Sequence, residues 1–349
     1  MQPIRIGERL VGPGQPVYVV AELSANHLQS LERAEAIVRA AAEAGADAVK
    51  LQTYTPHTIT LDADGPLFRI GGNTPWEGER LFDIYARAHT PWEWQPALMK
   101  LASELGIACF SAPFDPTAVD FLEGLGAPAY KIASFELVDL PLIERCARTG
   151  KPLILSTGMA SLSEVGEAIA AATGAGAVGV ALLKCTSAYP SPASALNLRS
   201  IRELADRFQV PVGLSDHTLD PEVPVAALAL GACIVERHLT LRRADGGPDA
   251  AFSLEPHELS AMVRSLRLCE AALGSAPFGP REDEREMTRF RRSLFVVRDV
   301  RAGERLTPEN VRSIRPGAGL APKHLPEVLG RRAARDLPRG TPLAWDQLA

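Results

Sequence analysis

Short apolar runs alternate with longer stretches of helical periodicity over most of the chain. In the longer stretches apolar residues recur every three or four positions, as in Leu31–Ala44, which is the pattern of an amphipathic helix. Eight strand–helix units in succession predict an α/β fold, a (β/α)8 TIM barrel. The expected strands are Val17–Leu23, Ala48–Gln52, Ala108–Ala112, Ala129–Ile132, Pro152–Ser156, Val178–Lys184, Val212–Ser215 and Ile234–His238.

The alternative is an open, doubly wound sheet. Such a sheet usually has about five to seven strands, and the G-x-G-x-x-G that often follows its first strand does not occur at that position. The run Ile4–Leu10 precedes the eight units, and we expect it to form an extra strand that plugs the bottom of the barrel. Thr53–Thr90, after the second strand, is a loop of the length that is usually functional or locally structured.

The last part of the chain differs from the rest. Gly274–Arg289 is rich in Gly, Pro and charged residues, as linkers are. The segment RDVRAGERL at 298–306 returns as RDLPRGTPL at 335–343, which suggests a small pseudo-symmetric, β-rich module. We therefore predict a barrel domain at 1–275, a linker at 276–289 and a second domain at 290–349. About 60 residues is near the lower limit of independent stability, so we expect this domain to lean on a barrel, its own or a partner's.

Composition and charge narrow the class of protein. The chain has 349 residues and no apolar stretch of about 18 residues that could span a bilayer. Its 5 Cys lie far apart with no C-x-x-C, which is typical of a reduced, cytoplasmic protein. The net charge of -5 divides into -10 for residues 1–280 (22 Lys and Arg, 32 Asp and Glu) and +5 for residues 281–349 (15 and 10). Because acidic residues interrupt the basic tail, we do not expect nucleic-acid binding.

Polar residues gather where the predicted strands end, which is the active face of a TIM barrel. Lys50, Lys131 and Lys184 lie on three different strands there, and serines accompany them at positions 111, 134, 156 and 215. This combination is typical of a cage for a phosphate or a carboxylate, to which we assign Ser111, Ser134, Ser156 and Ser215 together with the lysines. Two alternatives stay open. The lysines pair with Glu22, Glu136 or Glu236, or Lys131 or Lys184 forms a Schiff base.

Two histidines end neighbouring predicted strands. His217 and His238 are placed so that their rings could meet at one divalent metal ion, Mn²⁺, Mg²⁺, Co²⁺ or Zn²⁺. Such a metal would polarise a carbonyl as a Lewis acid. The alternative is that each histidine is a hydrogen-bonded structural residue. The cysteines, including Cys185 near the predicted site, are expected to be structural.

Several motifs resemble the sialic acid synthase family. In the barrel they are AELSANH (21–27), VKLQTYTP (49–56), YKIASFE (130–136), LSTGM (155–159), KCTSAYP (184–190), GLSDH (213–217), ERHL (236–239) and DAAFSL (249–254). FRRSL (290–294) and RPGAGL (315–320) resemble the family's antifreeze-like (SAF) domain. Lys184 and Ser187 stand where the neuraminate branch typically has His and Asn. Together with the insert at 71–85, they favour the pseudaminate branch.

The resemblance implies a reaction and a set of roles. Phosphoenolpyruvate, 2,4-diacetamido-2,4,6-trideoxy-L-altrose and water would give the nonulosonic acid and phosphate, as in bacterial surface or flagellin glycosylation. Glu22 and Glu136 would handle protons and, with Lys131 and Glu236, form the catalytic set. Lys50, Lys131, Ser134, Ser156, Ser187 and Ser215 would hold phosphoenolpyruvate, His217 and His238 the metal, and Gln52, Tyr189 and Asp249 the sugar. Phe290 and Arg315 would come from the tail of a second chain in a domain-swapped homodimer.

Other functions stay open at this point. A neuraminate or legionaminate synthase would use N-acetylmannosamine or a diacetamido-mannose. A phosphoenolpyruvate-condensing barrel that makes a seven- or eight-carbon keto acid phosphate would need a second phosphate site and lacks the tail module. A non-catalytic carbohydrate-binding protein would not need Glu22, Lys131, His217 and His238 together.

Overall fold

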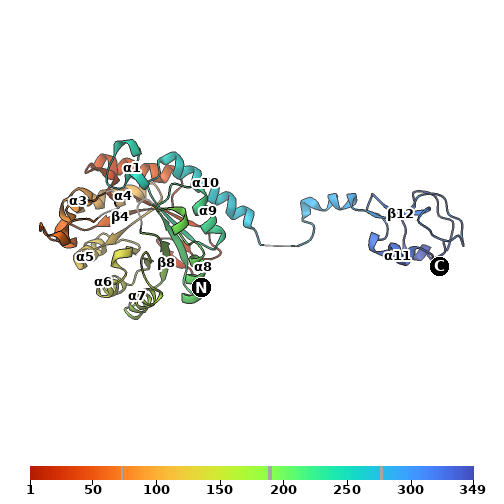
Figure 1. Cartoon of the computed structure of the whole chain (residues 1–349), viewed down its shortest axis with the longest axis horizontal. Coiled ribbons are helices and arrows are strands. Elements are labelled where there is room, and N and C mark those ends of the chain that lie inside the picture. Colours follow the sequence, from red (N-terminus) through yellow and green to blue (C-terminus); the bar gives the residue numbers. More distant parts are fainter. Residues whose placement is uncertain (72–73, 75, 188–190, 276–277) are drawn as a thin grey trace. The chain divides into compact units, whose positions relative to one another are not determined.

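Eight parallel strands close into a barrel, as the alternation of apolar runs and helical stretches predicts (Figure 1). The computed structural model describes residues 1–71, 74, 76–187, 191–275 and 278–349. The chain divides into two units, Met1–Gly274 and Ser275–Ala349. Around the barrel of the first unit the strands follow the order β10-β3-β4-β5-β6-β7-β8-β9. They are β3 (Tyr18–Glu22), β4 (Ala48–Thr53), β5 (Ala108–Pro113), β6 (Tyr130–Ile132), β7 (Leu153–Ser156), β8 (Val180–Cys185), β9 (Val212–Asp216) and β10 (Ile234–His238).

Helices connect these strands, and several of them begin at a side chain that caps the first turn. The Ser30 side chain accepts a hydrogen bond from Arg33 N, and Ser161 forms a reciprocal capping box with Glu164. These local bonds fix where each helix begins and so where the preceding loop can lie. The helices are α1 (Leu31–Glu43), α4 (Gln95–Glu104), α5 (Pro116–Gly124), α6 (Leu140–Ala147), α7 (Leu162–Gly174), α8 (Ser200–Phe208), α9 (Glu222–Ala229) and α10 (Pro256–Leu273).

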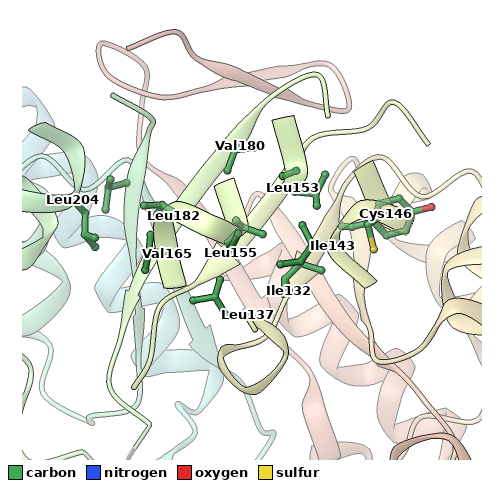
Figure 2. Close-up of a cluster of buried hydrophobic side chains, with 14 of the residues drawn as sticks. Ile132, Leu137, Ile143, Cys146, Leu153, Leu155, Val165, Val180, Leu182 and Leu204 are labelled. Atoms are coloured by element: carbon green, nitrogen blue, oxygen red, sulfur yellow. The ribbon is translucent and has the colours of Figure 1, made fainter. Parts of the chain in front are cut away.

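Side chains alternate between the inside and the outside of the barrel wall. Outward-facing residues such as Ile132, Leu155 and Leu182 pack against the helix layer, and Figure 2 shows this cluster with Ile143 of α6 and Val165 of α7. Each fully buried aliphatic side chain of this kind contributes roughly 1.5–3 kcal/mol of transfer free energy. The inward-facing side chains at the N-terminal ends of the strands are apolar and fill the barrel. Those at the C-terminal ends of the strands are polar.

The opening segment forms a hairpin, which corrects the expectation of a single strand over Ile4–Leu10. β1 (Ile4–Ile6) pairs antiparallel with β2 (Arg9–Val11), and Gly7 turns between them with φ +56°. A glycine adopts this conformation without the steric cost that a Cβ imposes. Ile4, Ile6 and Val11 are buried against the inward-facing residues at the N-terminal ends of the strands, so the hairpin does plug the bottom of the barrel.

The long connection after β4 has structure of its own. It contains α2 (Pro56–Ile59) and α3 (Leu81–Ala88), and we call residues 53–90 the β4 insertion. Tyr54 at its start is buried and contacts Tyr85 of α3 edge to face, with the ring centres 5.7 Å apart. None of the helices in the described part of the chain is long and apolar enough to cross a membrane.

The second unit is built around the repeat seen in the sequence. β11 (Ser293–Val296) pairs antiparallel with β12 (Val311–Ile314), and the short helix α11 (Leu325–Val328) packs on the same apolar cluster. The two repeat copies bond to each other reciprocally. Val300 and Leu337 exchange two backbone hydrogen bonds, and the carboxylates of Asp299 and Asp336 accept from the backbone N–H groups of Arg339 and Ala302. The predicted pseudo-symmetric module is therefore present.

Candidate active site

Two carboxylates and two lysines converge inside the C-terminal end of the barrel. Glu22 of β3 and Lys50 of β4 form an ion pair, and Lys50 Nζ lies 3.9 Å from Glu236 Oε2 on β10. Lys131 of β6 reaches across to Glu236 Oε1 at 3.3 Å, which Ser215 Oγ also contacts at 2.9 Å. All five side chains are nearly inaccessible to solvent. Charges buried in this way are usually stabilised by pairing and hydrogen bonding.

Burial and neighbouring charges shift the pKa values of these groups in different directions. Burial raises the pKa of Glu22 despite the charge of Lys50. Burial acts in the same direction on Glu236, but the charges of Lys131 and Lys50 outweigh it and lower the pKa of that carboxyl. For Lys131 burial outweighs Glu236, so its pKa is lowered. The cluster therefore holds one carboxyl with a raised pKa and one with a lowered pKa, beside a lysine whose pKa lies below its usual value.

A cradle of small polar groups lies beside Lys131. Ser134 belongs to the 3₁₀ turn η4 (Ser134–Glu136), and its Oγ accepts a hydrogen bond from Gly158 N at 3.2 Å. A Cβ at Gly158 would lie 2.6 Å from that oxygen and would also clash with Ser187 Oγ, so only glycine fits here. Ser156 Oγ and Ser187 Oγ are buried and have no hydrogen-bond partner among the described residues. Unsatisfied hydroxyls next to a lysine are suited to an anion's oxygens.

The two predicted metal ligands lie next to each other, with their rings tilted by 58°. The ring centres of His217 and His238 are 5.2 Å apart, and both rings contact Phe252. His238 Nδ1 is buried with no partner in the described part of the chain, and burial holds the pKa of His238 well below its usual value. A neutral imidazole with a free nitrogen is the form that binds a metal. In the described residues no group of three or more His, Cys, Asp and Glu is placed to hold a metal, so water and substrate oxygens would complete the coordination.

A series of side-chain hydrogen bonds extends from Glu22 toward the loop after β10. Gln52 Nε2 donates to Glu22 Oε1 and to Ser24 Oγ, both at 3.1 Å. Ser24 Oγ in turn donates to Asp249 Oδ2. Gln52, Ser24 and Asp249 therefore belong to one sector, above β10, β3 and β4, whereas the serine cradle lies above β6, β7 and β8. The site has two neighbouring sectors of different chemistry.

Two expected site residues lie outside this cluster. Ser111 is on the outer side of β5, where its Oγ shares a 2.6 Å hydrogen bond with Thr53 Oγ1, which also donates to Gln95 of α4. Lys184 is on the outer side of β8, and its Nζ donates to the carbonyl of Cys185 at 2.8 Å. Tyr189 lies outside the described residues. Phe290 and Arg315 are exposed residues of the second unit.

The structure also places side chains that the sequence analysis did not select. The Cys185 thiol faces the site, and although burial acts in the other direction, a hydrogen bond with His217 lowers its pKa to about 7. Cys185 follows Leu183, an inward-facing residue, at the strand period of two, and this spacing could have revealed its direction. Arg237 and Asp216 form a fully buried ion pair on the outer side of the wall, beside the two histidines in sequence.

Comparison with known proteins assigns both parts of the chain to known families. The model of the NeuB family matches residues 37–277, and that of the SAF domain matches residues 291–349. The chain belongs to the NeuB family. A pseudaminic acid synthase of Helicobacter pylori is 44% identical over 96% of this chain and 98% of its own length. An N,N'-diacetyllegionaminic acid synthase of Legionella pneumophila is 36% identical over 97% of this chain and 96% of its own length.

A solved structure of the same family supports the fold. The N-acetylneuraminic acid synthetase of Leptospira borgpetersenii, crystallised with citrate, is 31% identical and superimposes with a TM-score of 0.72, covering 82% of this chain and 95% of that one. The eight-stranded barrel followed by a SAF domain is thus the NeuB-family architecture, as the motifs predict.

Glu136 of this NeuB-family barrel should make stability depend on pH. Burial raises its pKa to about 7, and its Oε2 has no partner among the described residues. Below about pH 4.5 the carboxyl is protonated in the folded and the unfolded chain alike. Between pH 4.5 and 7 only the folded chain keeps the proton, so stability falls as pH rises through this window and the loss is complete above it.

Glu136→Gln should therefore flatten this dependence. The variant stays neutral at every pH and should exceed the parent in stability by about 1–3 kcal/mol at pH 8, but by little at pH 4.5. The measurement is the thermal midpoint of the barrel at both pH values, with Glu104→Gln on the exposed face of α4 as control. Parallel pH profiles for the parent and Glu136→Gln would show that Glu136 keeps an ordinary pKa.

Proposed function

We propose that this chain is a pseudaminic acid synthase, which condenses phosphoenolpyruvate with 2,4-diacetamido-2,4,6-trideoxy-L-altrose and water to give pseudaminic acid and phosphate. The observation that carries the proposal is the buried set of Lys50, Lys131, Glu22 and Glu236 between the serine cradle and the two histidines. The near full-length similarity to the Helicobacter pylori pseudaminic acid synthase supports this substrate. A cytoplasmic location, which free cysteines suit, is part of the proposal.

The serine cradle and the lysines bind phosphoenolpyruvate in this proposal. Ser134, Ser156 and Ser187 donate their hydroxyls to the phosphate, and Gly158 leaves the space that the phosphate occupies. Lys131 and Lys50 neutralise the charge of the phosphate and the carboxylate, with Ser215 holding Glu236 in place between them. Positive groups that are already ordered stabilise phosphate as a leaving group without reorganisation.

His217 and His238 fit a divalent metal ion. Their rings are neighbours, Nδ1 of His238 has no partner among the described residues, and one nitrogen from each ring would suit Mn²⁺, Mg²⁺ or Co²⁺ with oxygen ligands in the other positions. A metal bound there would act as a Lewis acid toward the aldehyde of the sugar. Gln52 and Asp249 orient the sugar in this proposal, and a further contact to the sugar is proposed for Tyr189, which lies outside the described residues.

The carboxylates move the protons. The C3 carbon of phosphoenolpyruvate attacks the aldehyde carbon, the new C–C bond forms, and the aldehyde oxygen takes up a proton. Water then adds at C2 and gives its proton to Glu22 or Glu136, whose raised pKa values suit them to accept and return it near neutral pH. The C2 hydroxyl then loses its proton as the bond between C2 and the bridging oxygen breaks, so that C2 becomes the ketone and the phosphate leaves with the bridging oxygen and one proton.

The position of the broken bond tests this mechanism. Phosphoenolpyruvate labelled with ¹⁸O in the bridging position should release phosphate that carries all of the label, as mass spectrometry can measure. Borohydride added during turnover should leave the mass of the chain unchanged, since no Schiff base forms. Unlabelled phosphate, or a covalent adduct on any lysine, would overturn the proposed mechanism.

Removing the metal should abolish turnover. Treatment with a chelator is expected to reduce phosphate release at least about 100-fold, and Mn²⁺, Mg²⁺ or Co²⁺ should restore it. His238→Ala should lower the affinity for Mn²⁺ about 10- to 100-fold, which calorimetry measures without turnover. His324→Ala in the second unit is the matched control. Full activity after exhaustive chelation would contradict a role for the metal.

We propose further that Arg315 and Phe290 act in the barrel of a second chain, where the arginine meets an acetamido group of the sugar. Both side chains are exposed within their own unit. Complementation tests this arrangement. Lys131→Met and Arg315→Met chains should each be inactive alone, but each mixed dimer should contain one intact site, so an equimolar mixture should recover about a quarter of the parent activity after the chains exchange. A monomer in sedimentation, or no recovery after the chains exchange, would contradict the shared site.

A further inference from the structure

The β4 insertion helps to form a pocket at the rim of the barrel that the mechanism above does not use. Its volume is about 470 Å³, within the range of small-molecule sites. Leu28, from the loop after β3, lines one side. Trp76, from the insertion, lines another, and Gly247 and Pro248, from the loop after β10, complete the wall. The walls come from segments that follow β3, β4 and β10, which are neighbours in the barrel, and the same strands and loops carry Gln52 and Asp249.

Hydrogen bonds hold the three walls together. Trp76 Nε1 donates to the carbonyl of Pro248 at 3.2 Å, which ties the insertion to the loop after β10. Gln29 Nε2 donates to the carbonyls of Arg87 and His89, at 3.1 and 2.7 Å, which ties the loop after β3 to the end of the insertion. The pocket is therefore built by the fold and does not depend on a single loose loop.

The backbone beside the pocket is strained. Leu28 and Gln29 are consecutive non-glycine residues with φ of 49° and 55°, which few such residues adopt. Gly247, with φ +117°, approaches so closely that a Cβ there would lie 2.6 Å from Leu28 Cδ2. Strain of this kind persists where the surrounding structure holds a functional conformation. Here it presents the Leu28 side chain to the pocket.

The pocket combines apolar walls with a charged edge. Leu28, Trp76 and Pro248 offer apolar surface, and an exposed ion pair between Arg87 and Glu79 offers polar groups at its edge. A hydroxyl-rich ligand would lose hydrogen bonds with water against the apolar wall. A ligand with methyl groups and one amide would bury the methyls and still find a donor and an acceptor in Arg87 and Glu79.

We propose that this pocket binds the end of the acceptor sugar that lies farthest from its aldehyde. This assignment rests on the proposed function. Asp249 directly follows Pro248 in the chain and is bonded through Ser24 to Gln52, so a sugar held by these residues extends outward into the pocket. The 4-acetamido group and the C6 methyl group of the diacetamido-trideoxy sugar match the apolar wall with its polar edge. N-acetylmannosamine carries hydroxyls at both positions.

Two variants test the pocket as a specificity site. Trp76→Ala should raise KM for the diacetamido sugar about 10- to 30-fold while kcat and KM for phosphoenolpyruvate change less than about twofold. Leu28→Asn should also raise that KM and should narrow the preference over N-acetylmannosamine, because asparagine tolerates positive φ and replaces an apolar surface by an amide. Leu67→Ala, in the same insertion and 89% exposed, is the control and should match the parent.

The outcomes separate the two proposals. If the parent does not turn over the diacetamido sugar, the proposed function fails. If the parent does, but Trp76→Ala and Leu28→Asn leave KM for that sugar unchanged, the pocket assignment fails and the function stands. Equal losses for both sugars would also overturn the assignment, since the wall would then not distinguish a methyl group from a hydroxyl. Thermal midpoints close to the parent's should accompany the expected losses.

Discussion

Lys131→Met should lower kcat/KM for phosphoenolpyruvate about 10³-fold. Lys131 is the buried cation that lies between the serine cradle and Glu236, and its Nζ is 3.3 Å from Glu236 Oε1. Methionine keeps the length of the side chain but removes the charge that the phosphate and the carboxylate require. A preorganised cation of this kind is worth several kcal/mol in a site that excludes water.

The Lys131→Met variant should still fold, because Ser215 continues to donate to Glu236 and Lys50 stays within 3.9 Å of it. The measurement is steady-state phosphate release, with calorimetric binding of phosphoenolpyruvate as a second readout. Lys100→Met, at an exposed lysine of α4 that pairs with Glu104 one turn away, is the matched control. If Lys131→Met binds and converts phosphoenolpyruvate within tenfold of the parent, the anion site lies elsewhere.

Arg237→Met should have the largest effect on stability, about 3–5 kcal/mol. Arg237 lies on the outer side of β10, where it pairs with Asp216 of β9 and donates to the carbonyl of Thr218. Both members of the pair are at most 1% exposed. Removing the cation leaves the Asp216 carboxylate buried with Thr218 as its one remaining hydrogen-bond partner among the described residues, and this cost far exceeds the packing energy that methionine keeps.

The same pair positions the histidines. Asp216 precedes His217 and Arg237 precedes His238, so loss of the pair should also lower Mn²⁺ affinity, a readout that a general loss of stability would not move at low temperature. Calorimetric scans should show the barrel's transition lowered by about 10 °C. Arg148→Met, which breaks an exposed pair with Glu144, should shift it little. A shift as small as the control's would show that the buried pair is replaceable.

The sequence predicts the barrel because one physical rule covers all eight units. Buried strands and amphipathic helices of fixed period can only pack in a few ways, and capping residues such as Ser30 and Ser161 limit the helix ends. The opening hairpin was predicted as one strand because its single glycine, Gly7, is a weak turn signal in a run this short. Its role as a plug follows from apolar pattern and was predicted correctly.

The candidate site was predictable only in part. Inward-facing residues near the C-terminal ends of the strands, such as Glu22, Lys50 and His238, lie in the site as expected. Ser111 and Lys184 were chosen by their place at a strand end, but the period of two directs them to the outer side of the wall. The rim pocket could not be predicted, because it depends on contacts between segments far apart in the chain, such as Trp76 with Pro248.

The most direct test of the account is a competition between two acceptors. The full-length chain is given phosphoenolpyruvate, Mn²⁺ and equal concentrations of 2,4-diacetamido-2,4,6-trideoxy-L-altrose and N-acetylmannosamine, and the products are identified by mass spectrometry. We predict pseudaminic acid as the dominant product, with one phosphate released for each molecule formed. N-acetylneuraminic acid as the dominant product, or phosphate release without a nine-carbon acid, would contradict the account.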